Sequence, residues 1–282
     1  MTSVSPAKHL GQHFLTNPRT IARIADAVGG TAGQTVAEIG PGTGALTAEL
    51  LRRGLHVLAV EMDDRCYPTL EDLSAQHDNR LTLIKGDALK LDTWLPHLPP
   101  GSPICGNLPY NVGTEITTRL LLAPYQPPTA EGRHPRAGGD PRYTAAQRSM
   151  SHPMVFMLQK EVIQRLTATG PSPHWGRLGV ITHLLCEARR LFDVPPGCFN
   201  PPPKVMSSIV QLTPLPAPRY EVDFAKLDTL LRHAFGQRRK MLRSSLKTLL
   251  SEDQITACGI PATARPEELS TQELCNLSNA IK

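Results

Sequence analysis

Residues 106–112, GNLPYNV, end an apolar run with groups that could act on an amine attached to a flat ring. Asn107 offers an amide oxygen as a hydrogen-bond acceptor. Pro109 fixes the local backbone, which would aim a neighbouring carbonyl, and Tyr110 offers a flat face for stacking. Two acceptors aimed at the two N–H groups of one amine would free its lone pair. An isolated NLPY is more often an apolar turn, so its place in the fold decides between the interpretations.

Alternating strand and helix patterns indicate the elements that must position this loop. Strands are expected at residues 35–40, 56–63, 80–87, 102–107, 153–159, 189–194 and 205–214. Helices are expected at residues 18–28, 45–54, 114–122, 160–168 and 176–188. Strands that alternate with helices predict an α/β fold with a mostly parallel, doubly wound sheet of seven strands. Ligands of such sheets bind beyond the carboxyl ends of the strands.

The chain is long enough for one large domain and one small domain. After the linker PLPAP, residues 214–218, the sequence has helical spacing without a clear strand. We therefore expect a large domain over residues 1–213 and a small all-α domain over residues 219–282. The segment 126–152 contains no Leu, Ile, Val or Phe, and we expect it to be a flexible surface insertion.

Composition constrains the function only weakly. No run approaches the roughly 18 apolar residues that span a bilayer, and the N-terminus lacks an apolar signal-peptide core, so we expect a cytoplasmic protein. The six cysteines show no zinc or redox spacing, no metal is expected, and Cys105 is expected to be a reduced, packed thiol. A net charge of +5 is mild evidence for a polyanionic partner.

Polar or glycine residues stand at the ends of four successive expected strands. The sequence AEIGPGTGALT, residues 37–47, brings three glycines between a strand and a helix, where a ligand could approach the backbone closely. Glu61 follows about 20 residues later, where an acid can hold ribose hydroxyls. Asp87 and Asn107 end the next two strands. Each residue alone is more often a turn or cap residue, but the ordered set favours one ligand crevice.

This ordered set resembles the class I S-adenosylmethionine-dependent methyltransferases, which implies a Rossmann-like fold. LGQHFL at residues 10–15 and FNPPPKV at residues 199–205 are similar to motifs of the ribosomal RNA adenine dimethyltransferases, most of all their bacterial small-subunit branch. The resemblance covers most of the chain. It implies methyl transfer from S-adenosylmethionine to N6 of two adjacent adenosines near the 3′ end of 16S rRNA in the 30S subunit, by a monomeric enzyme.

The resemblance also implies roles for individual residues. The catalytic residues would be Asn107, Pro109, Tyr110 and Phe199, with the Pro109 carbonyl favoured over that of Leu108 as second acceptor and Phe199 closing over the base. The cofactor would be bound by Gln12, His13, Leu15, Gly40, Gly42, Glu61, Met62, Asp87, Ala88 and Asn107. Asn111 is expected to cap the following helix.

Basic residues concentrate in residues 219–250, which contain eight Lys and Arg against three acids. On charge alone, a solvated helix face would be the better interpretation. Beside a base-modifying domain we favour contact with RNA, with Arg239, Arg243 and Lys247 at helical spacing. The expected RNA-binding residues are Lys204, Arg238, Arg239, Lys240, Arg243 and Lys247.

Other functions remain open from the sequence. A large-subunit rRNA dimethyltransferase that confers antibiotic resistance would share the catalytic motif. DNA adenine and protein glutamine methyltransferases usually carry Asn-Pro-Pro-Tyr, whereas position 108 here is Leu. Gly40, Gly42 and Ala45 also satisfy a dinucleotide-binding pattern, so a nicotinamide dehydrogenase is an alternative. A ribosome-assembly or RNA-binding role without catalysis could coexist with methyl transfer.

Overall fold

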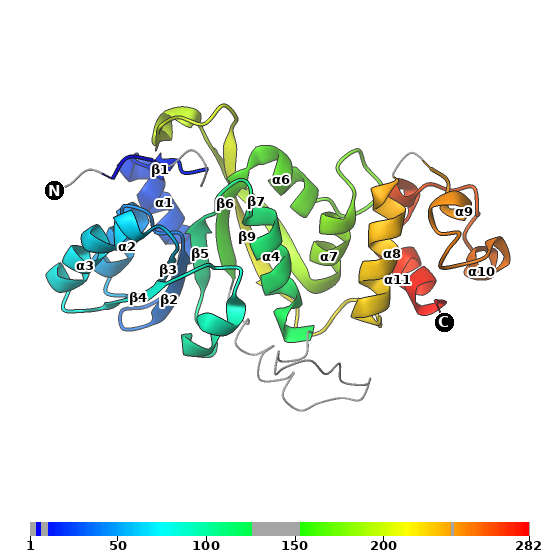
Figure 1. Cartoon of the computed structure of the whole chain (residues 1–282), viewed down its shortest axis with the longest axis horizontal. Helices are drawn as coiled ribbons and strands as arrows, with labels where there is room; N and C mark the ends of the chain where they lie inside the picture. Colours follow the sequence, from blue (N-terminus) through cyan, green and yellow to red (C-terminus); the bar gives the residue numbers. More distant parts are fainter. Residues whose placement is uncertain (1–3, 7–10, 126–152, 238–239, 282) are drawn as a thin grey trace. The chain divides into compact units, whose positions relative to one another are not determined.

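The computed structural model describes residues 4–6, 11–125, 153–237 and 240–281. Its main sheet contains seven strands in the order β4-β3-β2-β5-β6-β9-β7 (Figure 1). The strands are β2 Thr35–Ile39, β3 His56–Glu61, β4 Leu81–Lys85, β5 Ile104–Asn107, β6 Met154–Gln159, β7 Cys186–Val194 and β9 Ser207–Pro214. Strands β4, β3, β2, β5 and β6 pair in parallel, and β9 is antiparallel to β6. This confirms the predicted sheet.

The strand order reverses between β2 and β5. From β2 the chain proceeds outward to β3 and β4, and then returns to β5 on the other side of β2. Such a reversal opens a crevice at the carboxyl ends of the strands, because the connections leave in opposite directions. The glycine loop follows β2 and the loop of Asn107 follows β5, so the two predicted motifs flank this point.

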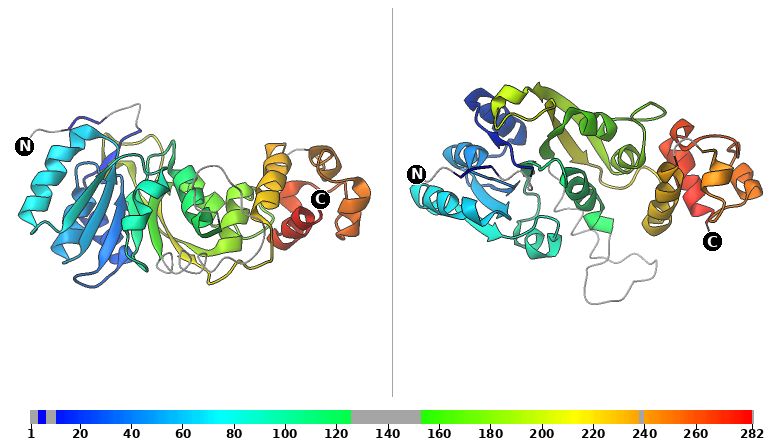
Figure 2. Two further views of the ribbon diagram at one scale, coloured as in Figure 1. Left: turned by 60° about the horizontal axis from the view of Figure 1, so that its bottom comes forward. Right: turned by 45° about the horizontal axis from the view of Figure 1, so that its top comes forward.

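The helices are α1 Pro18–Val28, α2 Ala45–Arg52, α3 Tyr67–Gln76, α4 Gly113–Leu122, α6 Lys160–Leu166, α7 Arg177–Leu185, α8 Phe224–Gly236, α9 Leu242–Ser245, α10 Glu252–Ala257 and α11 Thr271–Asn279. Helix α1 starts as predicted, because the Asn17 side chain accepts a hydrogen bond from Thr20 N and Pro18 occupies the first turn. Its buried face is Ile24, Ala25 and Val28. Helices α2 and α3 pack beside β3 and β4 respectively (Figure 2).

A second, two-stranded sheet joins distant parts of the sequence. Strand β1, Phe14–Leu15, pairs antiparallel with β8, Phe199–Asn200. These strands are too short for their side-chain pattern to be recognised, and they were not predicted. The pairing places residues of the LGQHFL and FNPPPKV motifs side by side. It also holds the N-terminal segment of residues 11–15, the strap.

Three local predictions were wrong. The helix expected at residues 176–188 ends at Leu185, and Cys186 already begins β7. Arg243 and Lys247, expected at helical spacing, do not share a helix, because α9 has only four residues, Leu242–Ser245. Asn111 does not cap α4: the N-cap residue is Val112, which makes no side-chain capping bond. Helix α3 was not predicted. The segment 126–152 lies outside the described residues.

The chain divides into two compact units. One contains the residues up to Ile163 and Arg189–Pro214, and the other contains Gln164–Ala188 and the residues from Leu215 onward. The second unit therefore includes α7, which the sequence placed in the larger domain. Within that unit α7 packs against α8 and α11, and the buried Trp175 donates a 2.8 Å hydrogen bond to the Leu269 carbonyl. The contacts of α7 with α8 and α11, which are distant in the sequence, thus explain why it groups with the second unit.

The strands that flank the crevice touch at a glycine. A Cβ at Gly106 would lie 2.4 Å from the Ile39 carbonyl oxygen, far closer than van der Waals contact allows. Since this oxygen belongs to the backbone of a buried strand, it cannot move aside cheaply. Glycine at position 106 therefore sets how closely β2 and β5 can bring their loops together.

We predict that Gly106→Ala lowers the free energy of unfolding by about 1–3 kcal/mol, the usual cost of overpacking a core. Gly86→Ala is the matched control, because a Cβ there meets nothing within 4 Å and Gly86 lacks a positive φ. Thermal or denaturant unfolding of both variants measures the effect. Equal stability of the two variants would contradict the steric explanation.

Candidate cofactor and catalytic site

A pocket lies at the carboxyl ends of β2, β3, β4 and β5, and the strap forms one of its walls. Its lining combines apolar side chains with a few polar groups, as is typical of sites for small ligands. The expected site residues that line it are Gln12, His13, Leu15, Gly40, Gly42, Glu61, Met62, Asp87, Ala88, Asn107, Pro109 and Tyr110. Phe199 is not among the lining residues.

Glu61 links the second strand end to the glycine loop. One carboxylate oxygen, Oε2, accepts a 2.9 Å hydrogen bond from Gly42 N, and the other accepts bonds from Met62 N and Asp63 N at 2.9 and 2.8 Å. Burial raises the pKa of the Glu61 carboxyl, and the three backbone N–H groups oppose that rise. The carboxylate is therefore fixed in place, and it has capacity for a further donor.

The glycine loop leaves room for a ligand on one side and meets the strap on the other. At Gly40, which has a φ of 66°, a Cβ would meet nothing closer than the Asn107 carbonyl at 3.9 Å. At Gly42, with a φ of 56°, a Cβ would lie 2.9 Å from the Phe14 ring. The strap thus lies directly against the loop.

Asp87 stands two residues beyond the end of β4. One of its oxygens, Oδ1, accepts a 2.9 Å hydrogen bond from Leu89 N, which forms a tight turn. The other oxygen has no hydrogen bond within the described residues, so it can accept one from a ligand. The neighbouring Ala88 and the exposed Met62 add apolar surface to the same part of the pocket.

The Asn107 amide has a defined orientation. Its Nδ2 donates a 2.9 Å hydrogen bond to the His13 carbonyl, in the strap. Because that carbonyl can only accept, the Asn107 Oδ1 is left as the free end of the amide. The His13 ring is held by a 2.8 Å bond between its Nδ1 and the Pro201 carbonyl, in which Nδ1 must carry the proton.

The carbonyl expected to assist Asn107 is already used. Pro109 O accepts hydrogen bonds from Val112 N at 3.2 Å and from Gly113 N at 2.7 Å, in the turn that begins α4. These two donors occupy both of its lone pairs. A role for Pro109 O as the second acceptor would therefore compete with these two bonds. Within the described residues no hydrogen bond reaches the carbonyl of Leu108, the alternative that the sequence had left open.

Of the two aromatic residues expected at the site, Tyr110 lies at the pocket and Phe199 lies in the core. The Tyr110 hydroxyl forms a 2.6 Å hydrogen bond with Ser207 Oγ, and its ring lies 5.5 Å from the His13 ring. Phe199 is only 4% exposed and belongs to the hydrophobic core below the strap. Instead, Phe14 supplies a second aromatic side chain to the pocket wall. Alternation along two-residue strands could not have distinguished Phe14 from Phe199.

Sequence reasoning overlooked a buried carboxyl in the pocket wall. Glu38 lies on β2, is 2% exposed, and accepts a 2.7 Å hydrogen bond from Thr47 Oγ1. Burial raises the pKa of Glu38 to about 7, the Thr47 hydrogen bond opposes the rise, and the nearby Glu61 adds to it. An acid immediately before a glycine loop in a buried strand is the signal that could have indicated it.

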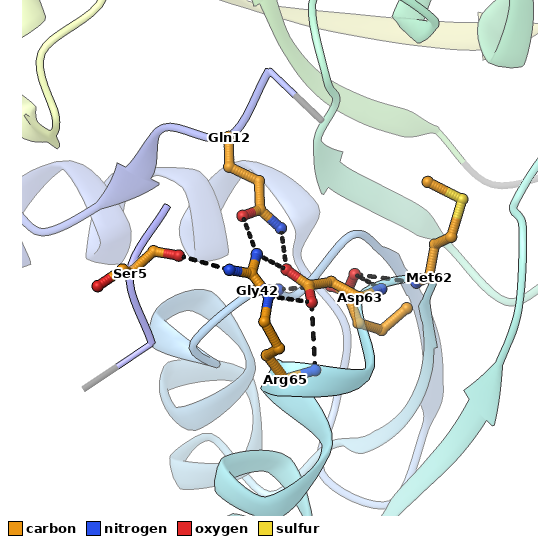
Figure 3. A network of polar contacts seen from close by, with 7 residues as sticks. Ser5, Gln12, Gly42, Met62, Asp63 and Arg65 are labelled. Atoms are coloured by element: carbon orange, nitrogen blue, oxygen red, sulfur yellow. Dashed lines mark hydrogen bonds and ion pairs between the residues drawn. The ribbon is translucent and has the colours of Figure 1, made fainter. Parts of the chain in front are cut away.

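A second overlooked group is an ion pair beside the strap (Figure 3). Asp63 is 5% exposed, and its carboxylate binds the Arg65 guanidinium at 2.6 Å. Arg65 and Gln12 hold the pKa of Asp63 down at about 2. The Gln12 amide donates to Asp63 Oδ2 at 2.7 Å, and Arg65 also donates to the Ser5 carbonyl at 3.0 Å.

The expected RNA-binding residues lie in both units and are not part of the pocket. Lys204 is exposed in the loop after β8. Lys240, Arg243 and Lys247 are exposed in and around α9, in the second unit. Arg238 and Arg239 lie outside the described residues. The part of the chain that the structure describes contains no group of His, Cys, Asp and Glu arranged to hold a metal, and none of its helices could cross a membrane.

Two solved structures with a similar fold are described as a dimethyladenosine transferase and an rRNA methyltransferase. A dimethyladenosine transferase from Plasmodium falciparum is similar, with a TM-score of 0.68, 24% identity, and coverage of 94% of this chain and 96% of the other. The 23S rRNA methyltransferase ErmE is similar with a TM-score of 0.63, 24% identity, and coverage of 95% and 99%. This likeness shows the fold, a Rossmann-like α/β domain whose pocket lies at the carboxyl ends of its strands.

Sequence comparison identifies the family within this class. The family model described as ribosomal RNA adenine dimethylase matches residues 5–282. Proteins named ribosomal RNA small subunit methyltransferase A are 42% identical in Ruegeria sp. (strain TM1040) and in Rhizobium etli (strain CIAT 652), covering 99% and 97% of this chain and 93% and 92% of those proteins. The chain belongs to the ribosomal RNA adenine dimethylase family, which uses S-adenosylmethionine to methylate adenine in rRNA.

We predict a specific pH dependence of stability from Glu38. Its pKa is raised on folding to about 7, so the folded state holds this proton more tightly than the unfolded state. The resulting stability is complete below the unfolded pKa of about 4.5 and is lost as the pH rises through 7. Glu38→Gln, which stays neutral, should gain stability relative to the wild type between pH 5 and pH 8, on the order of a few kcal/mol.

Thermal unfolding of the cofactor-free protein at the two pH values measures this difference. Glu71→Gln makes the same chemical change on the exposed surface of α3 and controls for the effect of the buffers. If the difference in stability between Glu38→Gln and the wild type is the same at pH 5 and at pH 8, Glu38 is not the titrating group.

Proposed function

We propose that this protein transfers methyl groups from S-adenosylmethionine to N6 of two adjacent adenosines near the 3′ end of 16S rRNA, giving N6,N6-dimethyladenosine. The substrate is the 30S subunit in the cytoplasm, the enzyme acts as a monomer, and the modification belongs to small-subunit maturation. The names of relatives at 42% identity over nearly the whole chain support the small-subunit target. The observation that carries the chemistry is the orientation of the Asn107 amide. Its nitrogen is bonded to the His13 carbonyl, so its oxygen is free beside the pocket.

The pocket fits S-adenosylmethionine in the arrangement of its polar groups. Glu61 accepts hydrogen bonds from the ribose hydroxyls, and the free oxygen of Asp87 accepts one from the adenine amino group. Met62 and Ala88 contact the faces of the adenine ring. The open backbone at Gly40 accommodates the methionine part, where a side chain would fill the space.

The target adenine occupies the part of the pocket beside Asn107. Its N6 amine is a poor nucleophile because the lone pair is drawn into the ring. Asn107 Oδ1 and the Leu108 carbonyl accept from the two N–H groups and free that lone pair. The Tyr110 ring provides a face for stacking, and the bond of its hydroxyl to Ser207 holds that ring in place. The base leaves its own stack to enter, as bases do in other base-modifying enzymes.

Methyl transfer in this slot depends on positioning rather than on a strong base. S-adenosylmethionine supplies a methyl group already activated on a sulfonium. A nitrogen–carbon bond forms as the sulfur–carbon bond breaks, and the amine then releases one proton to solvent. Once the first methyl is in place, one N–H remains to be held by Asn107 or Leu108. The same two acceptors can therefore position the amine for the second transfer.

Contact with the rRNA backbone involves the exposed basic residues. Lys204 is on the first unit, and Lys240, Arg243 and Lys247 are on the second. Side chains of this kind neutralise phosphates and release counterions, so binding to the 30S subunit should weaken steeply as salt increases. Their contribution is affinity rather than choice of base.

The test of substrate is methyl transfer to unmethylated 30S subunits, 50S subunits and adenine-containing DNA, with the modified nucleosides identified by mass spectrometry. We expect dimethyladenosine from 30S subunits alone. Dimethyladenosine from 50S subunits would favour the large-subunit alternative. Methylated DNA, or an absence of methylated nucleosides from all three substrates, would contradict the proposed function.

We predict that Asn107→Ala still binds S-adenosylhomocysteine, within about fivefold of the wild type, but loses methyl transfer by on the order of a hundredfold or more. The loss resembles that caused by removing one group that stabilises a transition state. Calorimetric titration and single-turnover transfer to 30S subunits measure the two effects. Near-normal transfer by Asn107→Ala would contradict the role of this amide.

A further inference from the structure

The strap is the part of the site with the least structure of its own. Its only regular structure, over the described residues 11–15, is the two-residue strand β1. The strap nevertheless supplies a wall of the pocket and the carbonyl that orients Asn107. A two-stranded pairing of this length is marginal by itself. Besides this pairing and the bond of the His13 ring to the Pro201 carbonyl, a further group of contacts holds the strap in register.

The Gln12 side chain is held at both ends by one ion pair (Figure 3). Its Nε2 donates to Asp63 Oδ2 at 2.7 Å, and its Oε1 accepts from Arg65 Nη2 at 3.3 Å. The cofactor role expected for Gln12 therefore competes with these bonds. The side chain is engaged as an anchor for the strap.

The ion pair itself is rigid. The Arg65 guanidinium binds Asp63 as a fork, with Nε to Oδ1 at 2.8 Å and Nη2 to Oδ2 at 2.6 Å. Paired bonds of this kind are strong and define one orientation. The Asp63 carboxylate also accepts from the backbone N of Arg65 at 3.1 Å, so its four acceptor positions are all used.

The network continues to both functional halves of the pocket. Asp63 N donates to Glu61, the proposed ribose acceptor, at 2.8 Å. In the other direction, Gln12 is followed by His13, whose carbonyl holds the Asn107 amide at 2.9 Å. The Phe14 ring then lies against Gly42. A shift of the strap would therefore affect the catalytic amide and the cofactor wall together.

We propose that Asp63 and Arg65 are positioning residues that act through Gln12: they fix the strap against the pocket, and thereby set both the lifetime of bound cofactor and the orientation of the Asn107 amide. Neither residue touches the reacting atoms. This inference rests on the proposed function, because it assigns the pocket to S-adenosylmethionine and Asn107 to catalysis.

Arg65→Ala is the variant that tests the proposal, because the Arg65 side chain is 45% exposed and its removal leaves little unfilled space. Changing Asp63 would also remove the cap of the short helical turn at residues 64–66, which confuses positioning with folding. Arg52→Ala is the matched control: Arg52 makes the same kind of fork with Glu49, at 2.8 and 2.7 Å, on α2 of the same unit.

Two rates are measured for the full-length protein. For Arg65→Ala we expect S-adenosylhomocysteine to dissociate about tenfold faster, the order expected for loss of a hydrogen bond to a charged group. We also expect a slower single-turnover methyl transfer to 30S subunits at saturating cofactor, by a similar factor. The melting temperature without cofactor should match that of Arg52→Ala, whose two rates should equal those of the wild type.

The double variant separates positioning from a general loss of structure. If Arg65 acts through Gln12, then Gln12→Ala with Arg65→Ala should show no larger change than the stronger single variant. Additive effects, or wild-type rates in Arg65→Ala, would overturn the positioning role. A wild-type protein that neither binds S-adenosylhomocysteine nor methylates 30S subunits would instead overturn the proposed function itself.

Discussion

The hydrogen bond from Asn107 Nδ2 to the His13 carbonyl joins the two loops on which the rest of the site depends. An amide has one donating and one accepting end, and only the accepting end suits an amine that must present its two N–H groups. Because the strap carbonyl takes the donor, the amide cannot turn over without losing this bond. The same contact therefore joins the strap to the loop of Asn107 and leaves the amide oxygen as the end that can accept a hydrogen bond.

Two buried carboxyls give this pocket its electrostatic character. Burial raises the pKa of both Glu38 and Glu61, and the nearby Glu61 adds to the rise at Glu38. A positively charged ligand in the pocket would favour their ionised forms and would in turn be stabilised by them. Asp63 differs, because the Arg65 guanidinium holds its pKa low and keeps it charged. Two carboxyls whose pKa values burial raises thus line the pocket, and a carboxylate that its ion pair keeps ionised near neutral pH stands beside them.

The sheet and the strand-end part of the pocket could be predicted because they depend on local patterns, whereas Gln12, His13 and Leu15 of the strap were expected only from the family resemblance. Buried strands, glycines between a strand and a helix, and polar strand ends all have signals within a few residues. What the sequence missed depends on contacts between distant segments: β1 with β8, α7 with α8, and Arg65 with Gln12. The hydrogen bonds to the Pro109 carbonyl were missed for a related reason, since the N–H groups that donate them belong to the turn into α4.

The most direct test of the site is a structure of the protein with S-adenosylhomocysteine and an adenosine nucleotide bound. We expect N6 of the adenosine to lie about 3 Å from both Asn107 Oδ1 and the Leu108 carbonyl oxygen, within ordinary hydrogen-bond distance. The Pro109 carbonyl should keep its two bonds to the start of α4. An adenosine bound elsewhere, or an Asn107 amide that turns its Nδ2 toward N6, would contradict the proposed chemistry.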